Sequence, residues 1–272
     1  MSSSAPSSGA RRRPHIYGRR KGPKLSPRQA GLFRTLLPAV ALDIRHGADA
    51  RSYFSPPPCG EVEKCSSHFS GGGIGARTPP PETPRASTSP QGRGGIDVDD
   101  VWLEIGFGAG EHLLWQAEHN PHVGLIGAEP YEGGVAKLLS RLSQAATPAN
   151  IRIHMGDARD ILAALPDASL GRVFILFPDP WPKTRHHKRR FLQMDMLDTL
   201  AARMKPGAEL RFASDDAPLV EYTLERLMAH PAFTWTAARA QDWKTRPTDW
   251  PPTRYEAKQL HGIPVFLEFR RV

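Results

Sequence analysis

The chain has 272 residues, of which 39% are hydrophobic, and it carries a formal net charge of +8. This length predicts one large domain or two small ones with a substantial core, and the positive charge favours an anionic partner. Its two cysteines exclude a disulfide framework and a CxxC metal pair, no run approaches the roughly 18 apolar residues that span a bilayer, and we therefore expect a cytoplasmic protein.

The first 42 residues hold nine Lys and Arg residues and no acid. This concentration of charge predicts that residues 1–25 form a flexible basic arm that binds a polyanion. A transit peptide and a merely solvated basic face are the alternatives. After Ser26-Pro27, apolar residues recur at helical spacing over residues 28–42, so residues 26–44 are expected to form a helical segment that packs on the main domain.

Residues 45–97 differ in composition from the rest of the chain, because they contain eight Pro, nine Gly and seven Ser. Such a segment cannot bury enough apolar surface to offset the entropy of ordering it, so we expect a disordered insert. Cys59, Cys65 and His68 have the wrong spacing and number for a closed metal site, and no metal is expected. The main domain is predicted to cover residues 98–272.

Within the main domain, strand and helix patterns alternate. Apolar runs rich in β-branched and aromatic residues predict strands over residues 101–105, 122–128, 151–155, 172–177 and 209–213. Helical spacing of apolar residues predicts helices over 111–119, 133–146, 160–165, 190–204 and 219–229, and two late runs, 234–238 and 265–270, are expected to be closing strands. The alternation predicts an α/β fold with a doubly wound, mostly parallel sheet and right-handed crossovers.

The turn after the first predicted strand reads GFGAG, with Glu104 before it and glycines at 106, 108 and 110. It is not the dinucleotide motif GxGxxG, because Glu111 occupies the third glycine position and would repel a pyrophosphate at the helix N-terminus. This disfavours a nicotinamide oxidoreductase. It favours S-adenosylmethionine, which carries a sulfonium and an ammonium and no phosphate, with a plain tight turn as the alternative.

Three further acids follow the next three predicted strands. Glu129 lies where a carboxylate can accept hydrogen bonds from both hydroxyls of a ribose. Asp157 is placed to accept a hydrogen bond from an adenine amino group, and Asp179 follows the fourth strand. Any one of them could be a helix cap or a surface charge. Acids at four successive strand ends together indicate a cofactor site.

The fourth predicted strand is followed by FPDPWPKTRHHKRR, residues 177–190. Prolines at alternate positions exclude a regular hydrogen-bond ladder, so we expect a stiff loop at the edge of the sheet where open α/β folds bind ligands. Trp181 offers a surface on which a base can stack, and a solvated basic face is the alternative interpretation. Five cations are expected to bind RNA phosphates: Lys183, Arg185, Lys188, Arg189 and Arg190.

These motifs resemble those of the bacterial single-chain tRNA (guanine-N7)-methyltransferases. The resemblance covers residues 16–42 and 100–270 and is carried by LEIGFGAGEH (103–112), NIRIHMGDA (150–158), FPDPWPKTRHHKRR and TRYE (253–256). It implies a Rossmann-like class I methyltransferase fold whose last strand is antiparallel, with S-adenosylmethionine as cofactor. The implied reaction is methylation of N7 of a guanosine in the tRNA variable loop, without a metal, a membrane or a required protein partner. The 45–97 insert has no counterpart in the family pattern.

The resemblance also implies roles for single residues. Asp179 corresponds to the catalytic position. The residues implied to bind the cofactor are Glu104, Gly106, Gly108, Glu129, Asp157 and Asp179. Those implied to bind the substrate are Lys183, Asp215, Thr253, Arg254, Tyr255 and Glu256, with Asp216 as an alternative to Asp215.

Three alternatives remain open from the residues themselves. Without the resemblance, Arg254 and Glu256 would be interpreted as a surface ion pair. The chain could be a catalytically inactive RNA-binding module on this fold, or an RNA methyltransferase that acts on another base or atom. Guanine N7 carries a lone pair and no proton, so its methylation needs no general base, and Asp179 could either steady the moving charge or orient the base.

Overall fold

The computed structural model describes residues 22–55, 95–144, 146–258 and 262–272. Most of the predicted basic arm, residues 1–21, lies outside the described residues. So do residues 56–94 of the predicted insert, which include Cys59, Cys65 and His68.

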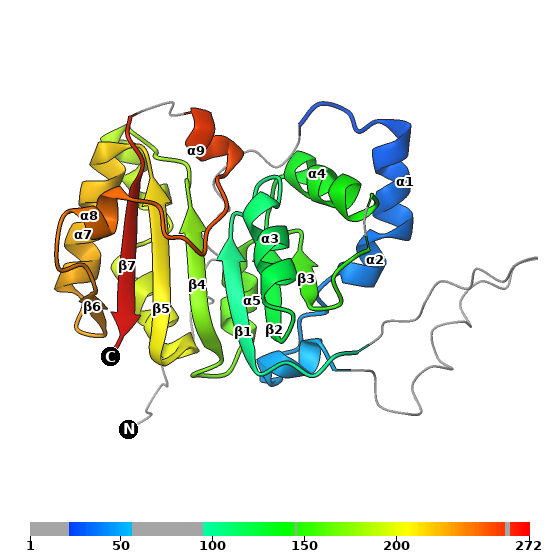
Figure 1. Cartoon of the computed structure of the whole chain (residues 1–272), viewed down its shortest axis with the longest axis horizontal. Helices are drawn as coiled ribbons and strands as arrows, with labels where there is room; N and C mark the ends of the chain where they lie inside the picture. Colours follow the sequence, from blue (N-terminus) through cyan, green and yellow to red (C-terminus); the bar gives the residue numbers. More distant parts are fainter. Residues whose placement is uncertain (1–21, 56–94, 145, 259–261) are drawn as a thin grey trace, which may run out of the picture.

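Seven strands form one sheet in the order β3-β2-β1-β4-β5-β7-β6 (Figure 1). Their bounds are β1 Asp100–Ile105, β2 Val123–Ala128, β3 Ile151–His154, β4 Leu170–Leu176, β5 Met204–Ser214, β6 Phe233–Trp235 and β7 Val265–Arg271. Strands β1 to β5 are parallel, whereas β7 is antiparallel to both of its neighbours. The predicted mostly parallel sheet with an antiparallel last strand is confirmed.

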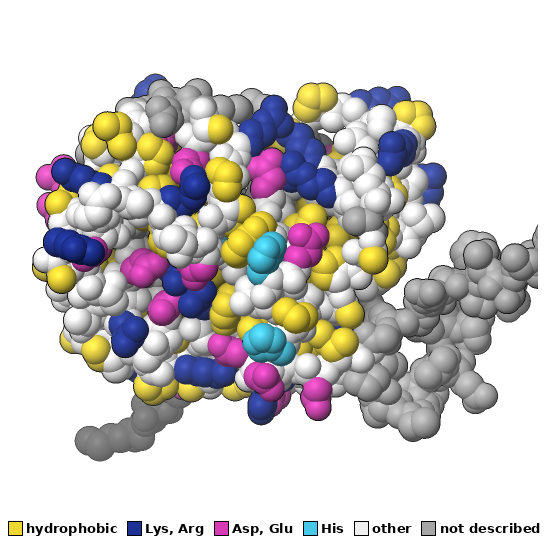
Figure 2. Space-filling model, viewed as in Figure 1, with side chains coloured by type: hydrophobic (Ala, Val, Ile, Leu, Met, Phe, Trp, Pro, Cys, Tyr) yellow, Lys and Arg dark blue, Asp and Glu magenta, His cyan; other side chains and the backbone are white. Residues whose placement is uncertain are grey.

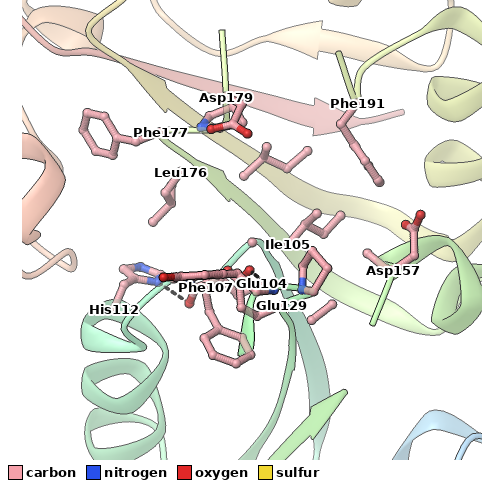
Figure 3. A pocket seen from close by; sticks show the side chains of 18 of the residues that line it. Glu104, Ile105, Phe107, His112, Glu129, Asp157, Leu176, Phe177, Asp179 and Phe191 are labelled. Carbon is pink, nitrogen blue, oxygen red and sulfur yellow. Dashed lines mark hydrogen bonds and ion pairs between the residues drawn. The ribbon is translucent and has the colours of Figure 1, made fainter. Parts of the chain in front are cut away.

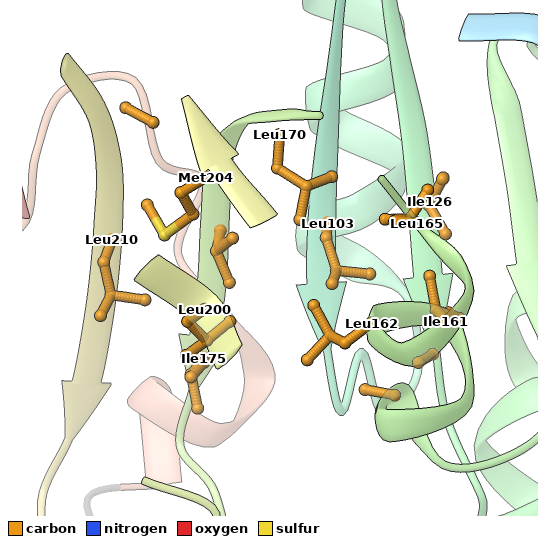
Figure 4. Packing of buried hydrophobic residues seen from close by; sticks show 14 of the residues in the cluster. Leu103, Ile126, Ile161, Leu162, Leu165, Leu170, Ile175, Leu200, Met204 and Leu210 are labelled. Atoms are coloured by element: carbon orange, nitrogen blue, oxygen red, sulfur yellow. The ribbon is translucent and has the colours of Figure 1, made fainter. Parts of the chain in front are cut away.

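The central strands are apolar on both faces, and helices cover each face and bury it. On one face lie α3 (Glu111–His119) and α4 (Glu132–Leu142), with α1 (Pro27–Thr35) against α4. On the other lie α5 (Ala158–Ala164), α6 (Met194–Arg203) and α7 (Ala217–Ala229). Alternate residues of β1 point to opposite cores. Trp102 belongs to the core that includes residues of α3 and α4, and Leu103 to the core that includes residues of α5 and α6, part of which Figure 4 shows.

Several element ends differ from the prediction for local reasons. The expected helix over 28–42 is two helices, α1 and α2 (Leu37–Val40), because Pro38 has no N–H to continue the first. The helix expected from residue 190 begins at Met194, after the 3₁₀ helix η2 (Thr184–Arg189). Strand β5 begins at Met204, before Pro206-Gly207, and is irregular there. Two short helices were not predicted, α8 (Gln241–Lys244) and α9 (Arg254–Lys258).

Residues 45–55, which the composition assigned to the disordered insert, belong to the folded domain. They contain the 3₁₀ helix η1 (Ala50–Tyr53), and Phe54 is fully buried. The Phe54 ring fills the space left by Gly124 on β2, where a Cβ atom would lie 2.4 Å from the ring. Arg152 of β3 also donates its Nε–H to the Tyr53 carbonyl at 3.0 Å. The predicted boundary at residue 45 is therefore wrong, because composition does not show that a few aromatic residues fill a gap in a distant sheet.

The ends of the undescribed segment meet at one place. The Ile96 N–H donates to the Phe54 carbonyl at 2.9 Å.

We expect that replacing residues 56–94 by a Gly-Ser linker preserves folding and raises the free energy of unfolding by about 2 kcal/mol, because shortening a loop roughly eightfold removes about three doublings of closure entropy. Urea denaturation measures the change. A length-matched Gly/Ser replacement should leave stability unaltered, and a deletion that unfolds the protein would contradict the prediction.

Candidate active site

The carboxyl ends of the parallel strands border a cavity of about 550 Å³ (Figure 3). Open α/β sheets bind ligands at this edge. All four acids predicted at strand ends line the cavity, with Asp179 across it from Glu104 and Glu129. Gly106 and Gly108 line it as well. The structure thus brings together every residue that the sequence predicted for cofactor binding.

The glycine turn adopts a backbone that glycine tolerates best. Gly106, Gly108 and Gly110 have φ angles of 77°, 55° and 72°, in the left-handed region. Helix α4 approaches the turn closely because Gly134 has no side chain: a Cβ atom there would lie 2.5 Å from the Gly108 carbonyl oxygen. The Gly108 N–H donates to Oε2 of Glu129 at 2.7 Å. The turn therefore shapes the cavity wall and orients one of its acids.

Glu129 is a buried acid held by the backbone. Its other carboxylate oxygen accepts from the Tyr131 N–H at 2.8 Å. Burial raises the pKa of Glu129, and although the two backbone hydrogen bonds oppose this, the charges of Asp179 and Glu104 add to it, so the net shift is upward. A ligand that brings positive charge or hydroxyl donors to this carboxylate would therefore relieve an unfavourable burial.

Glu104 is oriented by a buried chain of hydrogen bonds that the sequence reasoning missed. Nδ1 of His112 lies 2.8 Å from Oε2 of Glu104, and Nε2 of His112 lies 3.1 Å from the Gln116 amide nitrogen. Since an amide nitrogen only donates, Nε2 of His112 accepts and Nδ1 carries the proton toward Glu104. Gln116 also donates to the Asp249 carbonyl at 2.8 Å. Two polar residues four apart on the buried face of α3 were the available signal.

Asp157 is both a helix cap and part of the cavity wall. As N-cap of α5, its carboxylate accepts from the Arg159 N–H at 3.0 Å, and it pairs with the Arg159 guanidinium at 3.0 Å. Its contact with an adenine amino group stays a prediction.

The loop after β4 is held in an uncommon backbone conformation on both sides of Asp179. Phe177 and Trp181 each have a φ of 49°, which costs a residue other than glycine about 1–3 kcal/mol. Asp179 is exposed and lies on the cavity rim. Strain of this kind persists only where surrounding contacts determine it, and it clusters at functional sites.

The five cations of the loop differ in their exposure to solvent. Lys183, Arg185 and Lys188 are exposed, and the Arg189 guanidinium lies 4.8 Å from the centre of the Trp181 ring at the cavity wall. Arg190 is only 3% exposed and donates its Nε–H to the Pro180 carbonyl at 3.0 Å. The prediction that Arg190 binds phosphate is therefore wrong, because its side chain faces the protein.

The TRYE motif (253–256) comprises Thr253 and the first three residues of α9. The Glu256 N–H donates to Oγ1 of Thr253 and the Thr253 N–H to Oε2 of Glu256, at 3.2 and 3.4 Å, which is a capping box. Glu256 pairs with Arg246 at 2.6 Å, so the alternative of an Arg254–Glu256 ion pair is wrong. Thr253 lines the cavity, and the side chain of Tyr255 lies outside the description.

The two adjacent acids after β5 have different surroundings. Asp216 is the N-cap of α7 and accepts from the Leu219 N–H at 2.8 Å. Asp215 lines a second, more apolar cavity of about 440 Å³ with Trp235 and Trp243. Asp215 is therefore not among the residues that line the main cavity, and Asp216 is engaged in capping.

A second group of cations lies on α4 and α9, beside the cavity that Lys137 lines, and Lys and Arg side chains gather there in Figure 2. Lys137 and Arg141 come from α4 and Arg254 from α9. Glu111 joins the two helices, since it accepts from Nη2 of Arg141 at 2.6 Å and from the Arg254 N–H at 2.8 Å. Burial disfavours the Glu111 carboxylate, but these hydrogen bonds outweigh it and lower its pKa. The sequence analysis did not connect these cations, which come from segments far apart in the chain.

Among the described residues, no group of three or more His, Cys, Asp or Glu is arranged to hold a metal ion. None of the helices in the described ranges is long and apolar enough to cross a membrane.

Comparison with known proteins gives consistent matches. The family model "Putative methyltransferase" matches residues 99–263. The chain is 43% identical over 258 residues to a tRNA (guanine-N(7)-)-methyltransferase from Rhodospirillum rubrum, covering 94% of this chain and 87% of that protein. It is 42% identical over 263 residues to a protein of the same name from Paramagnetospirillum magneticum, covering 96% and 94%. A relative from Caulobacter vibrioides is 42% identical over 256 residues, covering 94% of each chain.

Proposed function

The chain belongs to the tRNA (guanine-N(7)-)-methyltransferase family, and we propose that it methylates N7 of a guanine in tRNA with S-adenosylmethionine as the methyl donor. One observation carries the proposal: four acids meet around a cavity that is bordered by a loop of exposed cations. Acids suit a ligand that is cationic and has no phosphate, whereas cations suit the phosphates of RNA.

The buried acids account for cofactor binding. Glu129, whose carboxylate is fixed by two backbone N–H groups, would accept hydrogen bonds from the ribose hydroxyls, and Asp157 would accept one from the adenine amino group. Glu104, oriented by His112, would hold the positively charged part of the cofactor. The raised pKa of Glu129 supports this assignment, because a cavity lined by several acids favours a cationic ligand.

Residues of the basic loop and of α9 account for most of the substrate binding. Thr253 lies on the cavity wall, where it can contact a tRNA nucleotide that enters the cavity, and the exposed Lys183, just before η2, is available to the tRNA outside it. Arg254, Tyr255 and Glu256 follow Thr253 in α9, and Asp215, which follows β5 and lines the second cavity, would contact the tRNA outside the main cavity. Lys183, Arg185 and Lys188 bind backbone phosphates, with Trp181 as a stacking surface.

Catalysis rests on alignment and electrostatics. When bound, S-adenosylmethionine would supply a methyl group on a positively charged sulfur: the bond from the methyl carbon to guanine N7 would form as its bond to sulfur breaks, the base would take up the positive charge, and neutral S-adenosylhomocysteine would leave. Guanine N7 has a free lone pair, so no side chain needs to remove a proton. Asp179 lies on the rim, where a carboxylate either steadies the moving charge or accepts from guanine N1–H and the amino group.

A direct experiment tests the function. The protein is incubated with methyl-labelled S-adenosylmethionine and bulk tRNA, and the labelled nucleoside is identified after digestion. We expect N7-methylguanosine. A different labelled nucleoside would show that the enzyme acts on another base or atom, and tRNA binding without label would show an inactive RNA-binding module.

Cofactor affinity should depend on pH through Glu129. Its pKa is raised in the free protein and should fall when the positively charged cofactor binds, so binding releases a proton. We therefore expect the affinity for S-adenosylmethionine to weaken as the pH falls through the raised pKa of Glu129, by at most tenfold per pH unit for one proton. Isothermal titration calorimetry in buffers of different ionisation enthalpy measures the proton count.

The matched variant for this prediction is Glu129→Gln. It should bind the cofactor more weakly at neutral pH, and it should no longer release a proton on binding at pH values near the raised pKa of Glu129. If the variant released as many protons as the wild type, another group would be responsible for the pH dependence.

A further inference from the structure

The loop that carries Asp179 needs anchors on both sides of that residue. Phe177 and Trp181, two residues before and after it, lie in the left-handed backbone region, which other residues than glycine rarely occupy. The N-terminal side is held by the Phe177 N–H, which donates to the Ala213 carbonyl of β5 at 2.7 Å. The C-terminal side begins at Pro180, and prolines at 180 and 182 leave it without backbone donors at those positions.

Arg190 supplies the anchor on the C-terminal side. Its side chain donates Nε–H to the Pro180 carbonyl at 3.0 Å, ten residues earlier in the chain. The Arg190 guanidinium lies 4.4 Å from the centre of the Tyr222 ring on α7, and that of Arg226 lies 3.4 Å from the same ring. The backbone of Arg190 is fixed too, because its carbonyl accepts from Gln193 at 3.0 Å.

These contacts require the guanidinium group of arginine, and they direct it toward the protein and not toward an RNA phosphate. A planar guanidinium can stack on a ring and donate from its edge at the same time, whereas the ammonium of lysine acts as a point charge. Arg190 is buried, and burial lowers the pKa of its guanidinium, an effect that Tyr222 and Asp216 partly oppose. Lys188, two residues earlier in the same segment, is exposed and therefore serves as the comparison for the buried Arg190.

We propose that Arg190 is a positioning residue, which links the Pro180 carbonyl to the Tyr222 ring of α7 and thereby fixes the direction of Asp179 at the cavity rim. The proposal rests on the function proposed above, because it requires that Asp179 acts on the methyl transfer. The cations of this basic segment then have two different roles. Lys183, Arg185 and Lys188 bind RNA, and Arg190 holds the loop.

The test compares Arg190→Lys with Lys188→Gln in single-turnover methylation of tRNA. For Arg190→Lys we expect the rate constant at saturating enzyme to fall at least tenfold, while the tRNA dissociation constant and its salt dependence stay unchanged. For Lys188→Gln we expect weaker tRNA binding, with a log–log salt slope reduced by about 0.7–0.9. Cofactor affinity, which depends on Glu104 and Glu129, should remain within threefold of the wild type in Arg190→Lys and reports that the variant is folded.

Two further measurements make the outcome decisive. Tyr222→Leu removes the aromatic ring and should lower the rate constant as Arg190→Lys does. Tyr222→Phe keeps the ring and should leave the rate constant close to that of the wild type. Trypsin should cleave after Lys183 or Arg185 faster in Arg190→Lys than in the wild type, since the loop is less fixed. A normal rate in Arg190→Lys, or a reduced salt slope like that of Lys188→Gln, would overturn the proposal. A wild type that does not methylate tRNA would overturn the proposed function itself, and this result is distinct from either.

Discussion

Replacing Asp179 by Ala should lower the single-turnover rate of methyl transfer by about 10²–10³-fold, the usual effect of removing one preorganised electrostatic group from an active site. Asp179 lies on the cavity rim between two strained residues, and its charge acts on Glu129 through space. Because Glu104, Glu129 and Asp157 remain, the affinity for S-adenosylmethionine should fall far less than the rate. Methylation is measured with limiting labelled cofactor and excess enzyme.

Two comparisons interpret this result. Asp167→Ala removes an exposed acid that pairs with Arg203 away from the cavity, and it should leave the rate unchanged. A tRNA with inosine at the target position lacks the guanine amino group, so a large loss with inosine would favour a role of Asp179 in orienting the base. Near-normal turnover of Asp179→Ala would contradict the assigned role.

Neutralising Lys183, Arg185 and Lys188 together to Gln should flatten the salt dependence of tRNA binding by about two units of log–log slope. Each phosphate contact to a single strand contributes about 0.7 units through the counterions that it releases. If the variants converge near 1 M salt, this slope corresponds to about 50-fold weaker binding near 0.15 M salt. Filter binding over a range of salt concentrations measures both quantities.

The matched control removes the same amount of charge elsewhere. Arg51, Arg239 and Arg270 are exposed on η1, before α8 and on β7, and the first two pair with acids at the surface. Changing these three to Gln should leave the salt slope within about half a unit of the wild type. An equal loss of slope in both triple variants would mean that only net charge matters and would return the loop to a solvated basic face.

Much of the fold could be predicted because it depends on local patterns. The two buried faces of each central strand produce continuous apolar runs, and helix α3 begins and ends at the predicted residues. The four acids were predictable as a group, since parallel strands necessarily bring their carboxyl ends to one edge. In α9 the sequence held an unused signal, since Thr253 and Glu256 have the spacing of a capping box.

Residues 45–55 show where composition is misleading. A stretch rich in Pro, Gly and Ser has too few apolar residues to form a core of its own. Phe54 nevertheless packs on Gly124, about 70 residues later, and the neighbouring Tyr53 is bound by Arg152. The contribution of one aromatic ring to a distant core is a non-local property that no local count contains.

The sequence by itself determined the alternation of strands and helices, the acids at the strand ends and the basic character of the loop from Phe177 to Arg190, because these follow from residue type and from spacing along the chain. Only the tertiary structure decided which cations of that loop face solvent and which face the protein. Lys188 and Arg190 are alike in charge and two residues apart, but Lys188 is exposed, whereas Arg190 is buried between the Pro180 carbonyl and the Tyr222 ring. The reason is physical: burial and hydrogen bonding depend on which distant groups fill the space around a side chain, and only the packing of α7 against the loop sets that.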